Sequence, residues 1–158
     1  MNKEQKQEFT RRISSANRGN LVVVTYDIFF TYCDEVENAF GKDDYPSFKE
    51  ALKKAQSVVS RLMETLDFTY PVSKELHVLY QFVNEKLSES LYKKDIEVLA
   101  EIKTIMKNLY DGFVEAAAKD LSEPLMKHAQ QVVAGMTYHK GNLTETLQDS
   151  DNSRGFLA

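Results

Sequence analysis

The side chains best suited to metal chemistry are thinly spread along this chain. A helical bundle that holds a carboxylate-bridged metal uses Glu-x-x-His pairs that project inward, and the sequence contains no such pair. Glu75 and His77 are two residues apart, so on a helix they point to different faces. The other histidines, His128 and His139, share no motif spacing with them. The sequence therefore predicts no metal site.

Other catalytic patterns are equally incomplete. Asp149, Asp151 and Ser153 match the start of a calcium loop. However, Arg154 occupies the position that needs glycine, and no bidentate glutamate follows. There is no phosphate-binding loop, no GxSxG nucleophile elbow and no Cys–His pairing that spacing could reveal. We therefore expect no enzyme activity and no cofactor.

Charge and cysteine usage narrow the class of protein further. The formal net charge is -4, which gives no general attraction to nucleic acid or to an anionic membrane. The single cysteine, Cys33, excludes an internal disulfide and suits a reducing compartment, with a buried small hydrophobe favoured over a reactive thiol. The first residues, MNKEQKQEF, lack the apolar stretch of a secretory signal. We expect a cytoplasmic protein.

No stretch of the chain has the character of a membrane span. The longest apolar run, from Leu21 to Tyr32, is too short to cross a bilayer and is interrupted by Asp27. The chain of 158 residues is 42% hydrophobic and 28% charged, a balance typical of a single soluble domain. Only 3 prolines and 6 glycines punctuate it, which favours long helices over many-turned β structure.

Apolar residues recur at helical spacing in four blocks. The first runs from Leu21 to Phe40 and stops at Gly41; the second begins near Pro46 and reaches Leu66. The third is expected to start with Ser73 as its N-cap and to end at Lys93-Lys94. The fourth is expected to be capped by Asp95 and to reach Ala117. Four amphipathic helices with short links predict an all-α, antiparallel up-down bundle.

Two flanks complete the predicted single domain, which we divide into an N-terminal arm (1–16), the bundle (17–120) and a C-terminal helix and tail (121–158). The arm carries Phe9 and Ile13, four residues apart, and is either a short docked helix or a mobile segment. Ser122 and Pro124 can start a further helix. The tail carries isolated apolar anchors: Val132, Val133, Met136, Tyr138, Leu143 and Leu147.

The apolar residues exceed what one bundle seam needs. The first block is also apolar off its main stripe, which is typical of a helix covered on more than one side. Either the arm and tail simply cap the bundle, or the bundle keeps a groove that receives an amphipathic segment. If the groove exists, the candidate contacts are Phe9, Ile13, Leu21, Tyr26, Phe29, Phe30, Leu62 and Leu66.

The order of several short segments resembles a known family. They are Ala16-Asn17-Arg18-Gly19-Asn20-Leu21 followed by Tyr26-Asp27, then Ala51 to Gln56, Leu62 to Asp67, Leu79 to Val83, and Lys93-Lys94-Asp95. Over residues 16–118 this order and spacing resemble the FliS family of flagellar export chaperones. The departures are Arg18 for proline, Asn20 for glutamate, Ile28 for glycine and Phe9 for tyrosine, and residues 121–158 extend past the usual family end.

The resemblance implies a cytoplasmic helical bundle without catalysis. Proteins of this family bind the disordered C-terminal segment of flagellin in apolar grooves, prevent premature polymerisation and aid export. Their N-terminal arm can cover part of that surface when the ligand is absent. The implied partner is the flagellin C-terminal segment. The alternative is a divergent adaptor that binds another flagellar or export protein, with its own tail occupying the groove. A monomer is favoured, and the oligomeric state stays open.

Overall fold

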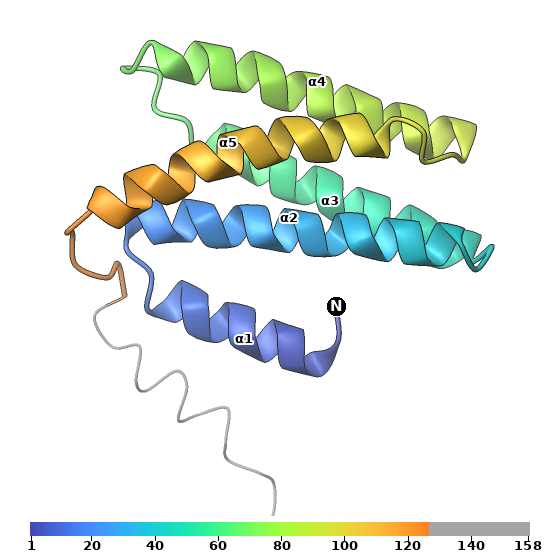
Figure 1. Cartoon of the computed structure of the whole chain (residues 1–158), viewed down its shortest axis with the longest axis horizontal. Helices are drawn as coiled ribbons and strands as arrows, with labels where there is room; N and C mark the ends of the chain where they lie inside the picture. Colours follow the sequence, from blue (N-terminus) through green and yellow to red (C-terminus); the bar gives the residue numbers. More distant parts are fainter. Residues whose placement is uncertain (127–158) are drawn as a thin grey trace, which may run out of the picture.

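The computed structural model describes residues 1–126, and within this range the protein is entirely helical (Figure 1). The predicted all-α class is confirmed. The helices are α1 (Lys3–Ser14), α2 (Arg18–Phe40), α3 (Tyr45–Glu64), α4 (Val72–Lys93) and α5 (Leu99–Lys119).

Helices α2 to α5 form the predicted antiparallel up-down bundle (Figure 1). Each packs against its neighbours in a ring, because α2 contacts α3 and α5, and α4 contacts the same two helices. The core includes Phe29, Leu52, Val83 and Ile102, none of which exposes any surface. Burying a side chain of this kind stabilises the fold by about 1.5–3 kcal/mol. The stability of the molecule therefore resides in these four helices.

One polar contact lies inside this core. The hydroxyl groups of Tyr26 on α2 and Tyr80 on α4 are 2.6 Å apart, and both side chains are buried. Each hydroxyl thus satisfies the other, as a buried polar group requires. Burial raises the pKa of Tyr26 above its ordinary value, so the phenol stays protonated. Cys33 is also buried, as predicted, and burial raises the pKa of its thiol to about 12.

The helix ends agree only in part with the sequence predictions. Gly41 does follow α2, Pro46 lies in the first turn of α3, and Lys94 ends α4 in a left-handed conformation (φ 58°). The two predicted N-caps of the later helices are wrong. Ser73 is buried inside α4, where its hydroxyl donates to the backbone carbonyl of Asp67 (2.6 Å) and so closes the preceding turn.

Asp95 does not cap the last helix either. Its carboxylate accepts a long hydrogen bond from the backbone N–H of Glu97 (3.3 Å), within a turn that precedes the helix. The helix α5 begins at Leu99 after Val98, without a side-chain cap. Residues 121–126 follow α5 without forming a helix, and the remainder of the predicted C-terminal helix lies outside the described residues.

The predicted arm is a helix that lies on the outside of the bundle. Asn2 and Gln5 form a capping box at the start of α1, with the Asn2 side chain accepting from the Gln5 N–H at 2.8 Å. The helix runs antiparallel to α2 and packs against α2 alone among the described helices (Figure 1). The docked-helix alternative is therefore the one that the structure adopts.

Candidate partner-binding surface

The outer side of α2 is covered by a short separate helix, α1. The α2 residues that face α1 recur at helical spacing: Asn20, Val23, Val24, Asp27 and Glu35. We call this set the covered face. Its upstream half is apolar at the two valines, and its downstream half is acidic.

The covering helix is held by few buried groups. Ser14 is the one buried residue of α1, Phe9 is half-buried, and Ile13 remains 37% exposed. An isolated helix of 12 residues is only marginally stable in water. The docking of α1 thus depends on a small contact with α2, and α1 is the helix that the bundle can most easily release.

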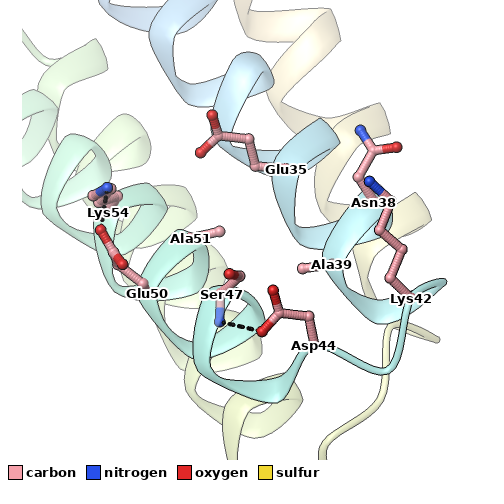
Figure 2. A pocket seen from close by; sticks show the side chains of 9 residues that line it. All are labelled: Glu35, Asn38, Ala39, Lys42, Asp44, Ser47, Glu50, Ala51 and Lys54. Atoms are coloured by element: carbon pink, nitrogen blue, oxygen red, sulfur yellow. Dashed lines mark hydrogen bonds and ion pairs between the residues drawn. The ribbon is translucent and has the colours of Figure 1, made fainter. Parts of the chain in front are cut away.

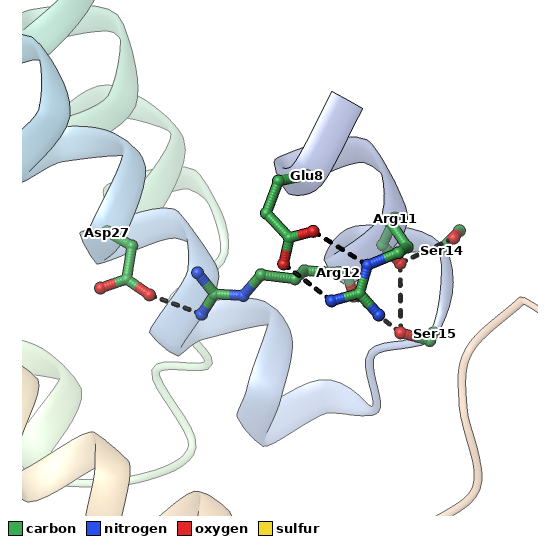
Figure 3. A network of polar contacts seen from close by, with 6 residues as sticks. All are labelled: Glu8, Arg11, Arg12, Ser14, Ser15 and Asp27. Atoms are coloured by element: carbon green, nitrogen blue, oxygen red, sulfur yellow. Dashed lines mark hydrogen bonds and ion pairs between the residues drawn. The ribbon is translucent and has the colours of Figure 1, made fainter. Parts of the chain in front are cut away.

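An ion pair provides the main polar contact between α1 and α2. The Arg12 guanidinium donates to the Asp27 carboxylate at 2.6 Å, with both side chains partly exposed (Figure 3). The neighbouring Arg11 turns back to Glu8 within α1 (2.7 Å) and does not reach α2 (Figure 3). A partly exposed pair of this kind contributes about 0.2–1 kcal/mol. The amino group of Met1 makes a second ionic contact, with Glu35.

A row of aromatic rings lies beside the covered face, between α2 and α5. The Tyr26 ring is 5.6 Å from that of Phe113, and the Phe30 ring meets the edge of Tyr110 at 5.8 Å. Burial, followed by the nearby charge of Asp27, raises the pKa of Tyr110. Phe30 is half-buried and forms the α2 wall of a shallow hollow whose α5 wall includes Lys103 and Lys107. Two partly exposed aromatic rings, Phe30 on α2 and Tyr110 on α5, therefore lie beside the covered face.

The structure divides the predicted contact residues into two groups. Three lie in the core and offer a partner no surface in this conformation: Tyr26, Phe29 and Leu62. The others keep accessible surface: Phe9 and Ile13 on α1, Leu21 and Phe30 on α2, and Leu66 just after α3. Leu66 packs against the core at the α3 end and is not part of the covered face. The tail anchors from Val132 to Leu147 lie outside the described residues.

Sequence reasoning missed the polar half of this surface. Arg12 and Asp27 attracted no attention because single charges 15 residues apart carry no local signal. The hollow where α1 meets α2 was missed for the same reason. It is lined by Arg11, Arg12, Ser15, Ala16, Asn20, Val23 and Val24.

A second hollow, between the end of α2 and the start of α3, has no comparable character (Figure 2). Its apolar lining is limited to Ala39 and Ala51, and several of its charged side chains already have partners. The Asp44 carboxylate accepts from the Ser47 N–H (3.1 Å), and hydrogen bonding from the Ser47 side chain and then its backbone lowers the pKa of Asp44. Glu50 pairs with Lys54 at 2.5 Å. Asp44 thus serves as the N-cap of α3, and the Glu50–Lys54 pair lies on the surface of that helix.

Two further observations concern residues 1–126 only. No three or more His, Cys, Asp or Glu side chains in that range gather closely enough to hold a metal ion. None of its helices has the length and apolar character needed to cross a bilayer.

A four-helix bundle with a small helix docked on one side places this protein in the class of all-helical bundle proteins. Comparison with known proteins gives the family. Residues 1–120 match the family model described as flagellar protein FliS, so the chain belongs to the FliS family. It is also similar to the flagellar secretion chaperone FliS of Bacillus subtilis (strain 168), at 24% identity over 104 residues, covering 66% of this chain and 78% of that protein. The family predicted from the sequence is confirmed.

Proposed function

We propose that this protein is a cytoplasmic, monomeric flagellar secretion chaperone that binds the C-terminal segment of flagellin on the covered face of α2. The family and the name of the Bacillus subtilis relative support the chaperone role. The single observation that carries the proposed site is the docking of α1, since the protein itself lays an antiparallel helix on this face through few buried contacts.

In this proposal the partner segment replaces α1. The exchange uncovers Val23 and Val24 and frees Asp27 from Arg12, so an incoming helix meets an apolar strip followed by a carboxylate. A disordered segment loses about 1–2 kcal/mol per residue that it orders. Each apolar anchor that it buries returns about 1.5–3 kcal/mol. The two terms nearly cancel, so the complex covers a large surface and still releases its cargo for export.

The test uses a matched pair of substitutions in the full chain, with a peptide of the flagellin C-terminal segment titrated by calorimetry. Val23→Asp places a charge in the covered face, whereas Val78→Asp places the same charge on α4, where Val78 is 63% exposed and α1 makes no contact. Loss of one valine anchor is worth about 1.5–3 kcal/mol, so Val23→Asp should weaken binding by about tenfold or more. Val78→Asp should bind as the unsubstituted protein does.

A third variant tests the exchange with α1. Arg12→Ala removes the ion pair to Asp27 and should tighten binding by up to about fivefold, because less has to be broken before the partner docks. If the peptide does not bind the unsubstituted protein or Arg12→Ala, the flagellin assignment is wrong. If it binds but Val23→Asp behaves like Val78→Asp, the covered face is not the site.

The alternative partner is another flagellar or export protein. It is favoured by a departure from the family pattern at the covered face, where Asn20 replaces a common glutamate. A second departure on α2 is Ile28 in place of glycine. The same three variants, titrated with other flagellar subunits, discriminate the two partners. Tight binding of such a subunit, lost in Val23→Asp, together with no response to the flagellin peptide, would establish the alternative.

A further inference from the structure

Two neighbouring helices share the acidic side chains of α2. Asp34 and Glu37 pair with α5, where the Lys103 ammonium lies 3.0 Å and 3.1 Å from their carboxylates. Asp27 instead pairs with α1, through Arg12 at 2.6 Å. The covering helix is basic, since it carries Lys3, Lys6, Arg11 and Arg12 but only Glu4 and Glu8. The covered face therefore meets the helix that lies on it through complementary charge.

Asp27 is held in place by groups of the bundle itself. The Tyr110 hydroxyl on α5 faces its carboxylate: burial first, and then the charge of Asp27 and a hydrogen bond to it, raise the pKa of Tyr110. Two rings from α2 hold Tyr110 in turn, with Tyr26 at 6.2 Å and Phe30 at 5.8 Å, both edge to face. The carboxylate is thus positioned from the bundle side, independently of α1.

Arg12 is the one ion-pair partner of Asp27 within residues 1–126. Lys107 on α5 is engaged elsewhere, because its ammonium pairs with Asp111 at 2.6 Å and lies 4.6 Å from the centre of the Tyr110 ring. Departure of α1 therefore leaves the Asp27 carboxylate without a cation unless the incoming segment supplies one. Covering an unpaired carboxylate costs its desolvation, so a neutral or acidic segment displaces α1 less readily.

The contact made by Arg12 suits a guanidinium in particular. Its Nη2 atom donates to the Asp27 Oδ2 (Figure 3). Its Cζ atom lies 5.8 Å from the centre of the Phe9 ring, about one turn earlier on α1. A planar guanidinium can hydrogen-bond to a carboxylate and stack on a ring together, whereas an ammonium is a compact, strongly hydrated charge. The pattern on α1 is thus an apolar ring followed three residues later by an arginine.

We propose that Asp27 is the specificity-determining residue of the covered face and selects helices that bring an arginine to it: Arg12 in α1, and a corresponding arginine in the partner. This inference rests on the proposed function, because it describes the partner that the same face binds. The partner segment is an amphipathic helix with an apolar residue about one turn before the arginine. Such a helix replaces the Arg12 contact with an equivalent one, so α1 acts as a competitor that admits basic helices and rejects others.

The first experiment is a double-mutant cycle on the full chain, titrated by calorimetry with a peptide of the flagellin C-terminal segment. Each arginine of the peptide is replaced in turn by citrulline, which keeps the shape of the side chain and removes its charge. The peptides are titrated against the unsubstituted chain, Asp27→Asn and the matched control Asp34→Asn, whose carboxylate pairs with Lys103. Comparing two peptides on the same chain cancels any effect of the substitution on α1.

One of the citrulline peptides should bind about fivefold more weakly to the unsubstituted chain and to Asp34→Asn. The same peptide should bind Asp27→Asn as tightly as the peptide that keeps its arginine, because the carboxylate that recognises the charge is gone. An equal loss of affinity on all three chains, or no loss at any arginine, would overturn the assignment of Asp27.

The second experiment needs no partner and follows hydrogen exchange of the α1 amides in the full chain. Arg12→Glu should raise the exchange rate several-fold, because it places two carboxylates together. Arg12→Glu with Asp27→Arg rebuilds the ion pair in reverse and should restore slow exchange, whereas Arg12→Glu with Asp34→Arg should not. Both double variants carry the same glutamate, so its effect on the helix α1 itself is common to them. Equal exchange rates in the two double variants would overturn the role of Asp27.

Failure of this inference and failure of the proposed function have different signatures. If the peptide binds but no arginine is coupled to Asp27, the flagellin assignment stands and the arginine requirement is wrong. If no peptide binds while the reversed pair restores the docking of α1, the selectivity of Asp27 for a cation is supported and the proposed function is wrong.

Discussion

Replacing Gly19 with alanine adds one methyl group at the closest approach between α2 and α5. The new Cβ would lie 3.0 Å from the Ala117 Cα, 3.1 Å from the Ala117 Cβ and 3.1 Å from a carboxylate oxygen of Asp120. Two of these neighbours belong to a helix backbone or lie directly on it, so they cannot swing aside as the end of a long side chain can. The two helices must therefore separate slightly, and the hydrogen bond from the Gly19 N–H to the Asp120 carboxylate (3.1 Å) must lengthen.

The expected magnitude follows from two opposing effects. Overpacking by one methyl group costs about 1–3 kcal/mol. Alanine returns at most about 1 kcal/mol through its higher helix propensity, and less in the first turn, where Gly19 lies. The net prediction for Gly19→Ala is a loss of about 0.5–2 kcal/mol in the free energy of unfolding.

Gly112 provides the matched control. It lies in the interior of α5, and a Cβ added there would meet no atom within 4 Å. Gly112→Ala should therefore stabilise the protein by about 0.5–1 kcal/mol, because only the backbone effect remains. The same chemical change is thus predicted to act with opposite sign at two positions of one protein.

Urea unfolding of the full chain, monitored by the far-ultraviolet circular dichroism signal, measures both free energies. In thermal melts, about 2–4 °C is expected for each kcal/mol in a chain of this size. Gly112→Ala should melt above the unsubstituted protein and Gly19→Ala below it. Equal stabilisation by both substitutions would refute the close contact of α2 with α5 at Gly19.

Three further predictions concern Tyr26, Asp120 and Cys33. Tyr26→Phe should destabilise the bundle by about 1–3 kcal/mol in urea unfolding, because it leaves the buried Tyr80 hydroxyl without a partner; Tyr26→Phe with Tyr80→Phe should cost less than the two single changes together, and strict additivity would contradict the contact. The pKa of Asp120 is lowered in the folded state, so its contribution to stability is full above the unfolded-state pKa and is lost as the pH falls through the lower folded-state pKa. Asp120→Asn should therefore make the free energy of unfolding less dependent on pH in acid. An unchanged pH dependence would contradict the hydrogen bonds to Asp120 from Ser122 and from the Gly19 backbone. Burial raises the pKa of Cys33 to about 12, so a thiol reagent at pH 8 should modify it rapidly only after urea unfolding, and fast reaction in native buffer would contradict its burial.

The bundle was predictable because helical periodicity reports directly which face of a helix is buried. The stripes of α2 to α5 were found for that reason, and the excess of apolar residues on α2 has a simple explanation. This helix packs against α1, α3 and α5, so three of its sides are covered. The same excess misled the choice of contact residues, because Tyr26 and Phe29 fill the core. Periodicity identifies a buried position but does not say whether the neighbour is the same chain or another.

What could not be predicted depends on contacts between distant segments. Ser73 is a good N-cap by residue type, but the carbonyl of Asp67 claims its hydroxyl once the preceding turn closes. The Arg12–Asp27 ion pair exists only because α1 folds back along α2. The hydrogen bond from the Asn17 side-chain amide to the Asp120 carbonyl is the extreme case, since these two residues meet only when the bundle has formed. Local sequence signals determine the elements, and their ends and surfaces are set by packing.

The weakness of α1 docking is a physical requirement if the covered face is to receive a partner. Any free energy that holds α1 on α2 is subtracted from the partner's binding, and each 1.4 kcal/mol lowers the apparent affinity about tenfold. A cover that buried several large side chains would close the site. No cover at all would expose Val23 on α2 to non-specific association. A mostly polar helix with one buried residue and one partly exposed ion pair lies between these limits. Because α1 contributes no side chain to the hydrophobic core of α2 to α5, the proposed exchange of α1 for a partner leaves that core intact.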